Sequence, residues 1–165
     1  IVISFFQASI EKVVALAVLM PIVASMGGNA GTQTLTVAVR ALATKELTAS
    51  NAFKIIIKET LVGGINGIIF AIIIGILSSY WFQNNLLGAV IASAMILNLL
   101  IAGMAGIIIP LTLSKFKIDP ALASGVILTT ITDVFGFLSF LGLASIFLIW
   151  IQSTWNCLNN THLYK

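Results

Sequence analysis

Four long apolar stretches constrain the fold of this chain more than any other feature. They cover residues 13–43, 55–82, 86–113 and 120–151. The core of a bilayer is about 30 Å thick, and a helix of about 20 apolar residues spans it. Only 8% of the residues are charged, whereas an ordinary soluble domain carries about 25%. We therefore predict an all-α membrane protein.

The two ends of the chain differ from these stretches. Residues 1–9 are apolar, begin without an initiator Met or a basic leader, and precede the charged residues Glu11 and Lys12. We interpret them as the end of a helix whose start is missing, followed by an aqueous turn. The prediction is thus a bundle of five transmembrane helices, the first truncated, in one domain over residues 1–151. Residues 152–165 are predicted to form a polar, loose tail.

The basic residues predict the orientation of the chain. Six of the eight lie in or beside two loops on the same side of the predicted bundle: Arg40, Lys45, Lys54, Lys58, Lys115 and Lys117. The positive-inside rule puts both loops in the cytoplasm, so the C-terminus lies outside, and the plasma (inner) membrane is the expected location. A net charge of +3 is small for a protein that binds nucleic acid. With one Cys and one His in the chain, a thiolate or imidazole metal site is not expected.

The first complete span carries a polar stripe. Residues three or four positions apart lie on one helix face, and here they are Pro21, Ser25, Asn29, Gln33, Thr36 and Arg40. Such residues either hydrogen-bond neighbouring helices or line a water-filled path. Pro21 and the cluster Gly27, Gly28 and Gly31 predict a kinked or locally opened helix, because Pro lacks a backbone donor and Gly weakens a helix. Asn29 is favoured as a site residue because open backbone there would expose carbonyls to ions.

A single acid, Asp133, lies deep in the last span. A charge at the centre of a bilayer costs about 2.5–3.5 kcal/mol, so it needs a cation, a water-filled cavity or a bound ion beside it. The sequence places no Lys or Arg at a comparable depth, which favours an ion site over a buried salt bridge. Helical spacing puts four residues around the acid, two of them glycines that let an ion approach: Leu122, Gly125, Thr129 and Gly136.

The available ligands favour a hard cation. Carboxylate, amide, hydroxyl and carbonyl oxygens suit Mg²⁺, Ca²⁺ or Mn²⁺ better than softer metals. Mg²⁺ gives up its water reluctantly, so a site with one acid would hold it through its hydration shell. One carboxylate cannot neutralise two positive charges, whereas a two-fold homodimer would bring two copies of Asp133 to a shared axis.

The other polar and small residues of the spans are first explained by packing. The spacing Gly63-x-x-x-Gly67 is typical of closely packed membrane helices. Asn66 and Asn98 are expected to hydrogen-bond between helices. Glu59, near the cytoplasmic end of its span, is expected to be a solvated end residue, with a vestibule position as the alternative. No combination of nucleophile, base and orienting residue predicts an enzyme.

Two motifs resemble the MgtE family of magnesium transporters and channels. The first consists of PIV at 21–23, GGNAGTQ at 27–33 and RALA at 40–43. The second consists of DPALASG at 119–125 and TTITDVFGF at 129–137. The resemblance implies five membrane helices per subunit and a homodimer that passes Mg²⁺ along the subunit interface.

The resemblance also assigns roles to residues. It implies that Asp133 binds hydrated Mg²⁺ with the backbone carbonyl of Thr129 near it, and that Asn29 and Thr32 or Gln33 line the path. Together with the helical spacing, this gives the predicted metal residues Asp133, Thr129, Asn29, Gly125 and Gly136, and the predicted pore lining Ser25, Thr32, Gln33, Thr36 and Leu122.

The predicted function is a homodimeric Mg²⁺ channel or transporter in the lipid bilayer, with Mn²⁺, Co²⁺ or Ca²⁺ as alternative ions. Some family members carry Asn where this chain has Gly125, so a side-chain contact is lost there or replaced by backbone. Many members place cytoplasmic regulatory domains, an N domain and paired CBS modules, before the spans, and these are expected to be missing here. Two alternatives stay open: an exchanger that couples a divalent cation to H⁺ or Na⁺, and a non-conducting membrane assembly module.

Overall fold

The computed structural model describes residues 2–48 and 50–162 of the chain, with side-chain surroundings as far as residue 147. All regular structure in these ranges is helical. The elements are the 3₁₀ helix η1 (Ile3–Phe6) and the α-helices α1 (Gln7–Lys12), α2 (Ala15–Ala43), α3 (Ala52–Phe82), α4 (Asn85–Lys115) and α5 (Pro120–His162).

Four of these helices are long and apolar enough to cross a membrane, as predicted. They are α2, α3, α4 and the first 28 residues of α5, Pro120–Phe147. The segment before α2 holds only the short helices η1 and α1, and the helical conformation ends at Val13. It rests on the end of the bundle, where the hydroxyls of Ser9 and Ser145 are 2.8 Å apart. The described residues therefore contain four complete spans and a short first segment.

Polar side chains fix where two of the spans begin. The Asn84 side chain accepts hydrogen bonds from the backbone N–H groups of Leu86 and Leu87, at 3.0 and 3.2 Å, and so caps α4. Asp119 Oδ1 accepts from the N–H of Ala121 at 2.9 Å, and Pro120 is the first residue of α5. The N-cap predicted at Asp119 is confirmed.

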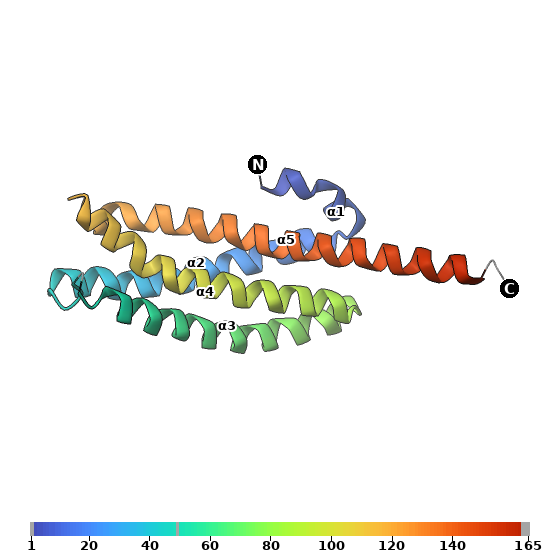
Figure 1. Cartoon of the computed structure of the whole chain (residues 1–165), viewed down its shortest axis with the longest axis horizontal. Helices are drawn as coiled ribbons and strands as arrows, with labels where there is room; N and C mark the ends of the chain where they lie inside the picture. The colour runs from blue at the N-terminus through green and yellow to red at the C-terminus, as the bar shows by residue number, and fades with distance from the viewer. Residues whose placement is uncertain (1, 49, 163–165) are drawn as a thin grey trace.

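Helix α4 is the centre of the bundle. It packs against α2, α3 and α5, whereas α2 and α3 make few contacts with each other. Figure 1 shows α4 lying between α3 and α5. The residues that α3 buries are all small, namely Gly63, Gly67, Ala71, Gly75 and Ser78. This is the pattern of a membrane helix that joins its neighbour by close backbone approach.

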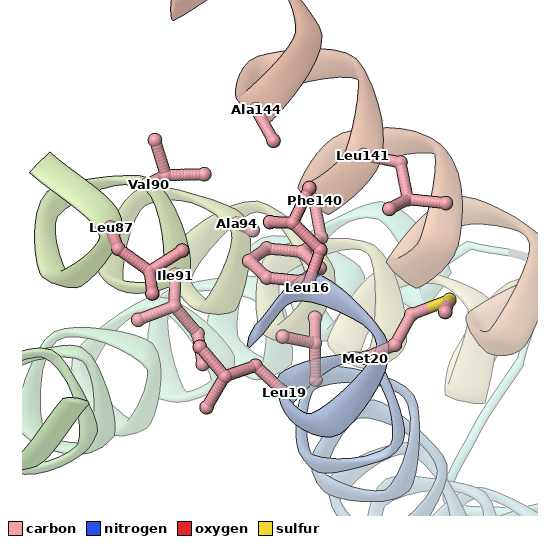
Figure 2. Close-up of a cluster of buried hydrophobic side chains, with 11 residues drawn as sticks. Leu16, Leu19, Met20, Leu87, Val90, Ile91, Ala94, Phe140, Leu141 and Ala144 are labelled. Atoms are coloured by element: carbon pink, nitrogen blue, oxygen red, sulfur yellow. The ribbon is translucent and has the colours of Figure 1, made fainter. Parts of the chain in front are cut away.

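The largest buried cluster lies toward the end of the bundle where α2 begins and α3 meets α4. It joins α2, α4 and α5 (Figure 2). Phe140 of α5 and Ile91 of α4 are fully buried at its centre, with Leu16 of α2 against them. Because lipid is as apolar as these side chains, the cluster stabilises the bundle mainly through close van der Waals contact.

Two predicted interruptions of regular helix are absent, namely the locally opened backbone in α2 and the loose tail, whereas the kink in α2 stays a prediction. Helix α2 continues without a break through Pro21 and the glycine cluster, so the locally opened backbone is absent from this helix. The glycines serve packing instead: a Cβ at Gly31 would lie 3.2 Å from Leu128 of α5. The predicted loose tail is also helical as far as His162, since no Gly or Pro interrupts α5 after Gly142. Residues 163–165 lie outside the described range.

Candidate functional site

Asp133 lies at the middle of the 28-residue apolar part of α5. Its side chain is half-buried in the single chain. Among the described residues it has no hydrogen bond and no ion pair. These residues also contain no group of three His, Cys, Asp or Glu side chains that could hold a metal. This lone carboxylate in the apolar part of α5 thus has no charge partner in the part of the chain that the structure describes.

The predicted neighbours of Asp133 on α5 are open to their surroundings. Leu122 is 83% exposed, Thr129 is exposed, and a Cβ at Gly125 would meet no atom within 4 Å. The hydroxyl of Thr129 donates to the backbone oxygen of Gly125 at 3.1 Å. The carbonyl of Thr129 in turn accepts the hydroxyl of Thr132, also at 3.1 Å. The helix therefore presents open space and the hydroxyl oxygen of Thr129 on this side, while the Thr129 carbonyl is engaged by the buried Thr132.

Gly136 differs from the other predicted site residues because it is buried. A Cβ there would lie 2.9 Å from Asn98 Nδ2 and 3.4 Å from the Cα of Ala24. Asn98, which is fully buried in α4, donates from Nδ2 to the backbone oxygen of Val23 at 2.7 Å. The interhelical hydrogen bond predicted for Asn98 is confirmed. Gly136 lets α5 approach α2 and α4, which sets the position of the helix that carries Asp133.

The polar stripe of α2 is also open. Ser25, Asn29, Thr32, Gln33 and Thr36 are all exposed. Within α2, Thr32 donates its hydroxyl to the oxygen of Gly28 at 2.7 Å, and Thr36 donates to the oxygen of Thr32 at 2.8 Å. Because these protons point into their own helix, the hydroxyl lone pairs point away from it.

The two open surfaces meet along one line. A Cβ at Gly28 would lie 3.9 Å from Thr132 Oγ1 and 4.0 Å from Thr129 Cγ2. Gly28 therefore faces Thr129 and Thr132, so the stripe of α2 lies beside the Asp133 edge of α5. We name the resulting surface the α2–α5 face, formed by Ser25, Asn29, Thr32, Thr36, Leu122, Gly125, Thr129 and Asp133.

Gln33 lies at the border of this face and also lines a groove on its other side. The groove runs between α2 and α3 over α4, has a volume of about 130 Å³, and is called here the α2–α3 groove. Glu59 and Asn66 of α3 and Thr34 of α2 are among the residues that line it. Glu59 is half-buried at this groove, so it differs from the solvated end residue that the sequence favours, and the vestibule position stays a prediction. Sequence periodicity could not locate the groove, because it depends on α2 and α3 both packing on α4.

Comparison with known proteins decides the family. Residues 20–143 match the family model of MgtE, a divalent cation transporter. The chain belongs to the MgtE family. The matched range includes the four spans except for the first residues of α2 and the last residues of α5, and it contains both Asn29 and Asp133. As an MgtE chain with four apolar helices, the protein is an integral membrane protein.

Three relatives are similar over most of the chain, and each is named a magnesium transporter MgtE. The protein from Bacillus subtilis is 41% identical over 147 residues, which is 89% of this chain and 33% of that protein. The Enterococcus faecalis protein is 38% identical over 88% of this chain, and the Thermus thermophilus protein 33% identical over 87%. The chain spans about a third of the length of these MgtE relatives.

Proposed function

We propose that this MgtE chain forms a homodimeric Mg²⁺ pathway with the α2–α5 faces of two copies around a common axis. The observation that carries the proposal is Asp133, a half-buried carboxylate in the middle of an apolar span that has no charge partner among residues 2–48 and 50–162. The names of the three relatives, all magnesium transporters, support Mg²⁺ as the ion.

Charge balance supports the pairing of two copies. A doubly charged ion between two Asp133 carboxylates is neutralised, whereas a single subunit leaves half of its charge unmatched. The α2–α5 face also carries exposed amide and hydroxyl groups at membrane depth, such as those of Asn29 and Thr129. Lipid cannot hydrogen-bond these groups, so a water-filled path covered by a second copy satisfies them.

The orientation of the threonine hydroxyls suits a hydrated cation. Water molecules around a cation point their hydrogens outward, so the wall of a path must offer acceptors. Thr32, Thr36 and Thr129 all donate their hydroxyl protons to their own helices. Their free lone pairs can therefore accept from the hydration shell of Mg²⁺, which keeps its water readily.

In this proposal the loops that carry the basic residues lie in the cytoplasm of a plasma-membrane protein, and the ion moves inward. The α2–α3 loop and the α4–α5 junction lie at the same end of the bundle, as this orientation requires (Figure 1). The two-copy arrangement would provide ion selectivity, because the paired carboxylates favour a compact divalent cation over monovalent ions. Mn²⁺, Co²⁺ and Ca²⁺ are the ions to compare with Mg²⁺.

Mg²⁺ uptake into liposomes tests the proposal. Replacing Asp133 by Asn keeps the shape and removes the charge, so we expect uptake to fall about tenfold or more. The control is Asp119→Asn, the same chemical change on the same helix, at a cap that Asn also fills. Uptake by Asp133→Asn equal to that of the parent would rule out the assigned role of this acid. Uptake that requires an imposed H⁺ or Na⁺ gradient would identify an exchanger instead.

A further inference from the structure

We propose that the α2–α3 groove is a second divalent-cation site, complete within one subunit and centred on the carboxylate of Glu59. The groove lies on the side of α2 that faces α3, away from the α5 side that carries Asp133. Its polar lining comes from two helices: Gln33 and Thr34 of α2, and Glu59 and Asn66 of α3.

The packing of α3 on α4 creates the groove. A Cβ at Gly63 would lie 2.6 Å from the backbone oxygen of Leu99, and one at Gly103 would lie 2.8 Å from the backbone oxygen of Glu59. These glycines let α3 lie directly on α4. Since α2 rests on another part of α4 and makes few contacts with α3, a channel-like space stays open between them. Leu99 and Gly103 form its floor.

The carboxylate of Glu59 lines the groove without a charge partner among the described residues. Glu59 is seven residues after the start of α3 at Ala52, which is about 10 Å along the helix axis, and Asn66 is about 21 Å along it. The half-buried carboxylate has no hydrogen bond and no ion pair among the described residues. Lys58, the adjacent cation in sequence, is exposed. A half-buried carboxylate without a charge partner is unfavourable, and a cation in the groove would offset this.

The ligands and the volume together indicate the class of ion. A carboxylate, two side-chain amides and a hydroxyl are oxygen donors, which suit Mg²⁺ or Mn²⁺ and not a soft metal. A groove of about 130 Å³ has room for several water molecules beside an ion. An ion that keeps part of its hydration shell and binds Glu59 directly fits this space.

Binding there would couple two helices that otherwise scarcely touch. Gln33 and Thr34 belong to α2, and Glu59 and Asn66 belong to α3, so an occupied groove ties α2 to α3. The site does not require the dimer or the Asp133 pair. It therefore stands or fails independently of the pore proposal.

Mn²⁺ binding to the purified full chain in detergent tests the site, with free Mn²⁺ followed by its electron paramagnetic resonance. In the Asp133→Asn background we expect one class of bound Mn²⁺ per subunit to persist. Adding Glu59→Gln should weaken that class about tenfold or more. The matched control is Glu11→Gln, the same change at an exposed acid on α1 outside the groove. Mn²⁺ titrations that are the same with and without Glu59→Gln would overturn the proposal.

A second variant tests the site even if Glu59→Gln folds poorly. Asn66→Ala keeps the carboxylate and removes one amide ligand, so Mn²⁺ affinity in the Asp133→Asn background should fall severalfold while the circular dichroism of the helices is unchanged. Unaltered affinity in Asn66→Ala, with Glu59→Gln too unstable to measure, would also count against the site. A Mn²⁺ class that disappears with Asp133→Asn alone reports on the pore and not on the groove.

Discussion

At the residue scale, the glycines of α2 are set by what lies opposite them. A Cβ at Gly27 would lie 2.2 Å from Nδ2 of Asn98, a side chain that is fully buried and holds the backbone oxygen of Val23. Asn98 cannot move aside without losing that hydrogen bond. Its Oδ1 already lacks a partner among the described residues. The contact between Gly27 and Asn98 is thus too close to accept an added methyl group.

We expect Gly27→Ala to lower the free energy of unfolding by about 1–3 kcal/mol, because the added methyl group overpacks the contact with Asn98. Gly142→Ala is the control: no atom lies within 4 Å of its Cβ position, and Ala is favoured over Gly in a helix by about 0.5–1 kcal/mol. The measurement is unfolding of the purified chain in increasing SDS, followed by circular dichroism. Equal stability of the two variants would contradict the close contact.

At the element scale, α3 is held to the bundle almost entirely by α4. Its buried residues are small, and many of its large apolar residues are exposed, including Ile65 and Ile73. The stability of this helix pair therefore depends on how closely the two backbones approach. Two neighbouring glycines of α3 allow this dependence to be measured.

Gly63→Ala should separate α3 from α4, because the new Cβ would lie 2.6 Å from the backbone oxygen of Leu99. We expect a loss of about 1–3 kcal/mol in unfolding free energy. In Gly64→Ala the nearest atom is the end of the flexible Leu100 side chain, at 3.0 Å, so the cost should stay within about 1 kcal/mol. Thermal unfolding in detergent compares the pair. If Gly64→Ala proved the more harmful, the α3–α4 packing described here would be wrong.

The elements also show which features the sequence could predict. Hydropathy located all four spans, and Asp119 and Pro120 marked the start of α5, because length, apolarity and capping are local properties. The glycine cluster of α2 was misinterpreted as opened backbone. These positions are glycine because Asn98 and Leu128 lie directly opposite them and leave no room for a side chain. Those partners lie far away in sequence.

The candidate site likewise has a part that the sequence predicts and a part that it does not. Asp133 and the stripe of α2 follow from charge and helical spacing, and the structure places them on adjacent helix surfaces. The burial of Gly136 and the position of Gln33 toward α3 depend on how the helices rotate against one another, which spacing alone does not give. Glu59 was weighed as an end residue because the sequence does not show that α2 and α3 stay apart.

At the scale of the whole molecule, the orientation in the membrane can be measured directly. We expect Ser50→Cys, in the loop between α2 and α3, to react with a membrane-impermeant maleimide only after the cells are opened, because basic loops stay in the cytoplasm. Asn85→Cys, at the opposite end of the bundle, should react in intact cells. Cys157 is replaced by Ser in both variants so that the native thiol gives no signal. The reverse labelling pattern would invert the topology.

The arrangement of two copies is the remaining property of the whole molecule. In a two-fold dimer the distance between equivalent labels is twice their distance from the axis. If the α2–α5 faces surround that axis, spin labels at Val126, which is 74% exposed on α5, should lie closer together than labels at Ile73, which is 53% exposed on α3. Pulsed dipolar spectroscopy of the chain in lipid nanodiscs gives both distances. A shorter distance at Ile73, or no coupling at either position, would show that the Asp133 carboxylates do not share an axis.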